Sequence, residues 1–223
     1  MGESKFLKKP DSGTVLVTGA IFIWVFIVNV ATVSFIFPAI DAVLTAGGKF
    51  FPNTYNAWST PTWPMFFVTI LYFIMGNDPK RSLEIFLGGT FGLLSCLFLF
   101  WATWQLMGQS AVFRGEPGLL SFPIAFIPVI FVILGVIILG GAWLPVIFNN
   151  AAFTYLIAGS ISLGKFFYTP NGVELYFREI GNNFLVFLIG GGIFLLGCIY
   201  IQKALIAWLT AKAIKAAAAA QGK

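Results

Sequence analysis

The chain has 223 residues, of which 59% are hydrophobic and only 9% are charged. A soluble domain carries about 25% charged residues, so this composition excludes a soluble protein and indicates one integral membrane domain. The sequence has no histidine and only two cysteines, which excludes bis-histidine haem ligation, most zinc and copper sites and a histidine general base. The net charge of +5 lies mainly at the termini, where it favours an anionic membrane surface and not nucleic acid.

The first 13 residues are polar and are expected to form a cytoplasmic N-terminal segment. A long apolar run follows and predicts a first membrane span over residues 14–37, which ends at Pro38. The run is too long for the core of a signal peptide and no Ala-x-Ala cleavage site follows it, so we expect it to be retained. Asn29 is its one strongly polar side chain.

The connection from residue 39 to residue 64 mixes aromatic residues with turn formers, a composition typical of the bilayer interface. The stretch Thr60-Pro61-Thr62-Trp63-Pro64 is a helix-start signal, because proline is favoured in the first helical turn. A short second span is predicted over residues 63–75. A polar turn around Asp78 and Pro79 then leads into a third span over residues 83–107.

The second half of the chain predicts three further spans. The fourth covers residues 119–140 and the fifth residues 144–166, joined by a very short uncharged hairpin. An outer loop follows, in which Asn171 can cap a short helix. The sixth span covers residues 183–210, and residues 211–223 are expected to continue as a basic, alanine-rich helix that forms a cytoplasmic tail. The expected fold is therefore all-α, with six transmembrane helices.

The distribution of lysine and arginine predicts the orientation of these spans. Cytoplasmic segments of membrane proteins carry an excess of basic residues. With six spans, eight basic residues fall on one side and four on the other, so we expect both termini in the cytoplasm and the protein in the plasma (inner) membrane. The inner set is Lys5, Lys8, Lys9, Lys80, Arg81, Lys212, Lys215 and Lys223, and the outer set is Lys49, Arg114, Lys165 and Arg178.

Two similar stretches predict an internal repeat. Residues 88–99 and residues 190–201 share two leading glycines, a Leu-Leu pair and the chain's only cysteines, Cys96 and Cys198. The stretches lie on the third and sixth spans, which cross the membrane in opposite directions. That arrangement is typical of a 3+3 inverted repeat in which spans three and six are equivalent. The alternative is a chance match between two segments rich in glycine and leucine.

Polar side chains inside the predicted spans are candidates for a solute path, because a polar group in lipid is costly unless it pairs or faces water. The alternative is that the asparagines bond between helices and that the threonine and serine are small packing residues. The path candidates are Asn29, Thr90, Ser95, Asn149 and Asn150. The glycines expected to pack helices closely are Gly88, Gly89, Gly92, Gly190, Gly191 and Gly192.

No phosphate loop, dinucleotide fingerprint or metal-ligand spacing occurs, so no catalytic residue, metal or cofactor is predicted, and the chain is not expected to be an enzyme by itself. Asp41 and Glu84 are the only acids near the hydrophobic region, and both are expected at its edges. The leading hypothesis is a passive channel or facilitator for a small neutral or weakly charged solute.

Two other functions stay open. The chain can be a non-catalytic subunit of a larger membrane complex, which includes a membrane enzyme complex, or a homo-oligomeric scaffold. In those cases the glycine faces and aromatic loops would pack against partners. The expected partners are the lipid bilayer together with further copies of the chain or other membrane subunits, and a small solute under the leading hypothesis.

Overall fold

The computed structural model describes residues 12–39, 62–108, 120–169 and 171–221, and these ranges contain helices and turns without a strand. The prediction of an all-α protein is confirmed for them. Some charged residues that entered the sequence argument lie outside the described ranges: Lys5, Lys8, Lys9, Asp41, Lys49, Arg114 and Lys223.

Four helices in the described ranges are long and apolar enough to cross a membrane, which places the protein in a membrane by length and composition. They are Ser12–Ala39, Pro79–Met107, Phe122–Gly140 and Gly172–Ala220, and they coincide with the first, third, fourth and sixth predicted spans. The first contains α1 (Ser12–Ala31) and a π-helical segment, η2 (Thr32–Ile36). The second contains a 3₁₀ turn, η3 (Pro79–Arg81), and α4 (Ser82–Met107), and the third is α6 (Phe122–Gly140).

The second and fifth predicted spans are short helices. α3 (Trp63–Ile74) has 12 residues and α7 (Asn150–Ser160) has 11. At a rise of 1.5 Å per residue they are about 18 Å and 17 Å long, well below the ~30 Å hydrocarbon core of a bilayer.

The prediction of one continuous fifth helix over residues 144–166 is wrong. Residues 141–149 form turns, α7 ends at Ser160, and a single helical turn, α8 (Leu163–Phe166), follows. The physical reason is the side chain of Asn149, which accepts hydrogen bonds from the backbone N–H groups of Ala151 and Ala152 and so fixes the start of α7.

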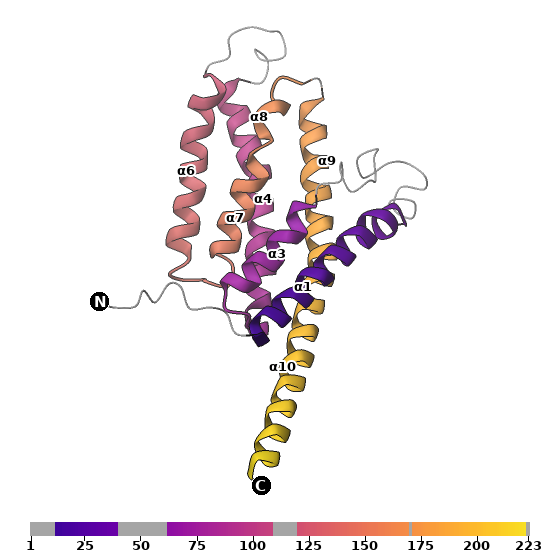
Figure 1. Ribbon diagram of the computed structural model, residues 1–223. Coiled ribbons are helices and arrows are strands. Elements are labelled where there is room, and N and C mark those ends of the chain that lie inside the picture. The colour runs from indigo at the N-terminus through magenta and orange to yellow at the C-terminus, as the bar shows by residue number, and fades with distance from the viewer. Residues whose placement is uncertain (1–11, 40–61, 109–119, 170, 222–223) are drawn as a thin grey trace, which may run out of the picture.

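The sixth predicted span is part of a much longer helix. It begins as α9 (Gly172–Leu185), passes through a π-helical segment, η4 (Val186–Gly190), and continues as α10 (Gly191–Gln221). The predicted start at residue 183 is therefore too late, whereas the expectation that the alanine-rich tail continues as a helix is confirmed as far as Gln221. Alanine has the highest helix propensity of any residue, which explains why α10 continues away from the other helices (Figure 1).

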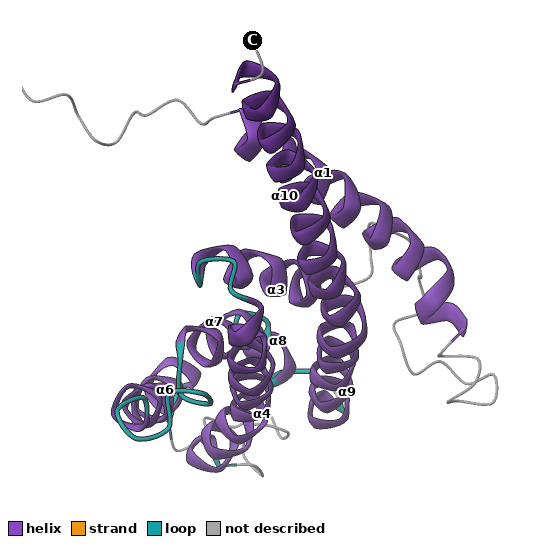
Figure 2. Ribbon diagram, turned by 90° about the horizontal axis from the view of Figure 1, so that it is seen from below, coloured by secondary structure: helices purple, strands orange, loops and turns teal. Residues whose placement is uncertain are grey.

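Each of the two glycine-bearing helices packs on one short helix and one long helix. α4 packs along α7 and against α6, whereas α10 packs along α3 and against α1. Viewed from below, α4, α6 and α7 gather on one side and α1 and α10 on the other (Figure 2). α4 and α10 run in opposite directions along the bundle (Figure 1).

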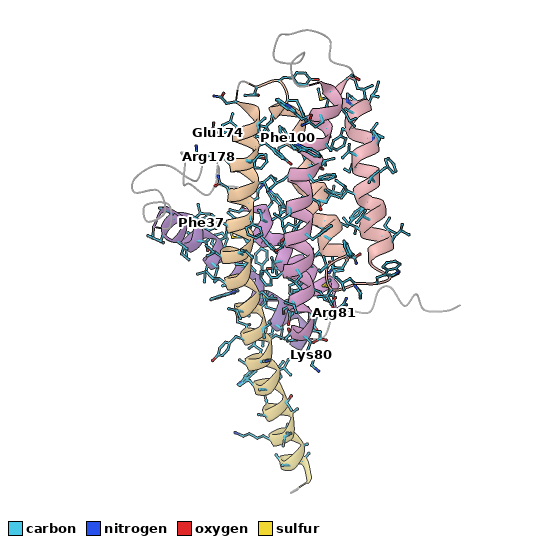
Figure 3. All side chains as sticks on the ribbon, turned by 180° about the vertical axis from the view of Figure 1, so that it is seen from behind. Phe37, Lys80, Arg81, Phe100, Glu174 and Arg178 are labelled. Carbon is cyan, nitrogen blue, oxygen red and sulfur yellow. The ribbon has the colours of Figure 1, made fainter. Side chains whose placement is uncertain are left out.

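The core forms two hydrophobic clusters. One joins α1, α3, α10 and η4 with parts of α4 and α7, and the other joins α4, α6, α7 and α9. The second is rich in stacked aromatic rings, with the ring of Phe100 4.7 Å from that of Phe167 and 4.6 Å from that of Tyr176. Charged residues lie toward the ends of this bundle: Lys80 and Arg81 at one end, Glu174 and Arg178 toward the other (Figure 3).

Candidate functional site

The two short helices meet deep inside the bundle, through Tyr155 of α7. The Tyr155 hydroxyl donates a hydrogen bond to the backbone carbonyl of Pro64 in the first turn of α3. Its ring centroid lies 5.9 Å from that of Trp63 and 6.1 Å from that of Phe67. The side chain is fully buried, and a methyl group on Gly92, which is near the middle of α4, would touch the Tyr155 Cβ. The junction of α3 and α7 at Tyr155 therefore lies level with the middle of α4.

Glycine allows α4 and α7 to approach so closely. A methyl group at Gly92 would overlap the backbone carbonyl oxygen of Ala152, and one at Gly88 would overlap the amide of Asn149. On the other side, methyl groups at Gly190 and Gly191 would meet the side chains of Met65 and Val68 of α3. The two glycine sets thus contact two different short helices, and Gly192 has no neighbour within 4 Å of an added methyl group.

The sequence-predicted path residues fall into different surroundings. Asn149 is a helix cap: its Nδ2 donates to the carbonyls of Glu84 and Val146, each at 2.9 Å, while its Oδ1 accepts from the first turn of α7. Thr90 and Ser95 lie on α4, half-buried and buried respectively, and Asn150 is exposed at the start of α7. These four share the α4–α7 pair.

Asn29 lies apart from that group, on α1, which packs against α10. Its Oδ1 is buried and accepts no hydrogen bond within the described part of the chain. The hydroxyl of Thr32, one turn later and at the start of η2, is likewise buried and unpartnered there.

Sequence reasoning missed a buried pair of amides, Asn182 and Asn183, which it left at the outer end of the sixth span. They are only 1% and 2% exposed, and neither Oδ1 accepts a hydrogen bond from any described residue. The signal was available: no charged residue occurs from 180 to 202, so two adjacent asparagines stand inside an apolar segment. The late predicted start of the helix concealed their depth.

Neighbouring contacts on α9 place Asn183 at the junction of the short helices. Three residues before it, Ile180 lies 3.7 Å from a methyl group added at Gly159 of α7. Four residues after it, the ring of Phe187 lies 4.6 Å from that of Tyr155 and touches the Gly89 position of α4. Residues three and four apart share a helix face, so Asn183 lies on the face that turns toward Tyr155.

A π-helical segment begins three residues after Asn183, and this segment, η4, packs on α3. Single π-helical turns are rare within helices and are found frequently at functional sites. The other π-helical segment, η2, starts three residues after Asn29. Each described π segment therefore follows a buried amide whose oxygen has no partner in the described chain.

Aromatic side chains close the junction on both sides. On the side of α8, which contains Lys165, the aromatic residues are Phe100, Phe167 and Tyr176. Lys165 forms an ion pair of 3.1 Å with Glu179 of α9. Toward the opposite end, ring pairs pack at 5.2 Å (Phe86 with Phe187) and 5.6 Å (Phe66 with Phe194). At that rim Tyr72 can donate to Gln202 Oε1 at 2.8 Å, and Arg81 pairs with Glu84 at 2.7 Å.

The acid nearest to Asn183 along α9 is Glu179, one helical turn away, and its charge is compensated by the ion pair of 3.1 Å with Lys165. No group of three or more potential metal ligands occurs among the described residues. What the junction offers chemically is hydrogen-bond acceptance by the Oδ1 of Asn183, beside the rings of Tyr155 and Phe187. Comparison with family models, curated proteins and solved structures finds no match.

Proposed function

We propose that the protein is a passive facilitator for a small neutral solute across the cell membrane. The observation that carries the proposal is the meeting of two short helices, α3 and α7, beside buried and unpartnered amide oxygens. In transporters built from inverted repeats, a pair of short or broken helices in equivalent positions marks the solute site near the bilayer midplane.

The packing supports a 3+3 inverted repeat. In such a repeat α1, α3 and α4 of the first half are equivalent to α6, α7 and α10 of the second half. The packing of α4 on α7 then corresponds to the packing of α10 on α3, and the packing of α4 on α6 corresponds to that of α10 on α1. Cys96 lies against the carbonyls of Tyr155 and Leu156 of α7, and Cys198 lies beside Thr69 of α3. The opposite directions of α4 and α10 agree with the same exchange (Figure 1).

The compensated charges around the junction favour an uncharged solute and passive movement. A proton-coupled carrier uses an ionisable group within the membrane. In the described spans Glu84 is paired with Arg81, and Glu179, one turn from Asn183, is paired with Lys165, so neither carboxylate is an uncompensated charge. Because aromatic clusters cover the junction on both sides, the solute moves when one cluster opens at a time. The mechanism is therefore that of a facilitator which alternates between two sides, in place of a permanently open pore.

The orientation with both termini in the cytoplasm also belongs to this proposal. Lys80 and Arg81 lie at the end of the bundle from which α10 extends, so the basic residues of the turn and of α10 share one side (Figure 3). That distribution supports a cytoplasmic location for this end.

Reconstitution into liposomes tests the function. Proteoliposomes with the full chain are mixed rapidly with hyperosmotic urea, acetamide or glycerol, and re-swelling is followed by light scattering. We expect at least one neutral solute to enter faster than in protein-free liposomes and in liposomes with an unrelated membrane protein. Entry at the protein-free rate for every solute would contradict a facilitator.

A subunit of a larger membrane complex is the second candidate, favoured by the far part of α10. Its residues from 210 to 220 are exposed in the isolated chain, and its charged side chains there, Lys212 and Lys215, are both basic. Native mass spectrometry of protein purified from its own membrane in mild detergent distinguishes the two. A stoichiometric second polypeptide supports the subunit, and a single polypeptide species supports the facilitator.

A further inference from the structure

We infer that Asn183 is the solute-binding residue of the junction, and that the ligand is a small neutral molecule with N–H donors, of the amide or urea class. This inference rests on the proposed facilitator function and adds the ligand's chemistry to it. It assigns the site to α9, away from the asparagines of α1 and α7.

The buried amide oxygen of Asn183 is energetically costly. A buried amide oxygen without a hydrogen bond destabilises a fold, and the cost is greater in a membrane, where no lipid group can supply a donor. Asn183 is 2% exposed, and its Oδ1 has no donor among the described residues. Leucine has nearly the same shape and carries no such cost, so packing alone does not account for an amide at this position. Hydrogen bonding to a bound ligand does account for it.

Asn183 also lies at a depth that suits a solute site. Asn183 lies on the face of α9 between the contacts of Ile180 with α7 and of Phe187 with Tyr155. That level corresponds to the middle of α4, where Gly92 meets α7. The site is therefore near the bilayer midplane, where a facilitator needs its solute to stop between the two sides.

The chemistry of the amide oxygen determines which ligand it can bind. An amide oxygen accepts hydrogen bonds, so it recognises a donor and repels the oxygens of a carboxylate. A metal cation needs about six oxygen ligands to replace its water, which two asparagine side chains cannot provide. Aromatic rings at Phe187 and Tyr155 suit the flat faces of a small planar amide.

Acetamide and acetate provide the test, because they have nearly the same shape and only acetamide carries N–H donors. Swelling of proteoliposomes is measured at pH 8, where acetate is ionised, for the wild type and Asn183→Leu. We expect the wild type to admit acetamide and not acetate. In Asn183→Leu the protein-dependent rate of acetamide entry should fall about tenfold, because the loss of one hydrogen bond weakens binding by roughly that factor. Gln105→Leu, which removes an exposed amide on α4, is the matched control and keeps the wild-type rate.

Thermal stability in detergent separates a binding role from a structural one. If Asn183 serves binding, Asn183→Leu keeps or raises the melting temperature, and acetamide stabilises the wild type but not the variant. A lower melting temperature with an unchanged ratio of acetamide to acetate entry would show that the amide is structural, and overturn the inference. Wild-type acetamide entry that persists in Asn183→Leu also overturns it while leaving the facilitator intact. Solute entry at the protein-free rate in the wild type overturns both.

Discussion

Gly92 of α4 lies directly against the backbone carbonyl of Ala152 in α7, with no room between them for a methyl group. A backbone carbonyl cannot rotate aside as a flexible side chain can. We therefore expect Gly92→Ala to separate α4 from α7 and to destabilise the protein by about 1–3 kcal/mol, the usual cost of overpacking. The measurement is the unfolding free energy in mixed micelles of increasing SDS content.

Gly192→Ala is the matched control for that substitution. It also places alanine in a helix of the same bundle, but an added methyl group there meets no atom within 4 Å. Since alanine favours helix over glycine by about 1 kcal/mol, Gly192→Ala should be neutral or stabilising. Equal destabilisation by both variants would show that α4 and α7 do not pack as described.

A second prediction concerns the hydrogen bond between Tyr155 and Pro64. Tyr155→Phe keeps the ring but removes the donor, so the side-chain hydrogen bond that joins α7 to the Pro64 carbonyl of α3 is lost. Hydrogen bonds between membrane helices average about 0.6 kcal/mol, and we expect a loss of that size or up to ~2 kcal/mol in unfolding free energy. Tyr168→Phe, at an exposed position, should leave it unchanged.

A third prediction uses the two thiols, which are free and buried. Cys96 packs against the Gly159 position of α7, and Cys198 belongs to the cluster around α3 and α10. Neither should react with N-ethylmaleimide in folded protein, and both should react after denaturation, as counted by mass spectrometry. Rapid labelling of either thiol before unfolding would place that face of its helix in solvent.

A fourth prediction addresses orientation. Because the native thiols are buried, Thr210→Cys in α10 and Tyr168→Cys at the opposite rim each introduce an accessible thiol. In intact cells a membrane-impermeant maleimide should label Tyr168→Cys but reach Thr210→Cys only after the cells are opened. The reverse pattern would invert the proposed orientation, and labelling of both in intact cells would place both ends outside.

The sequence predicted the long spans well and the interior poorly, for identifiable reasons. Apolar length alone locates α4 and α6, and proline in the first turn locates the start of α3 at Trp63. Length could not show that Asn149 caps α7 and breaks the fifth span, because a capping amide and a path-lining amide look alike in a sequence. The site depended on where α9 begins, since a start at Gly172 moves Asn183 from the surface into the interior.

The absence of a break between η4 and α10 has a mechanical consequence. From Gly191 to Gln221 the chain forms one helix of 31 residues, about 46 Å long at 1.5 Å per residue. A pivot of about 10° at η4 would sweep its far end through about 8 Å. If η4 bends when a solute passes Asn183, the exposed part of α10 moves with it, and a spin label on Thr210→Cys would report that displacement.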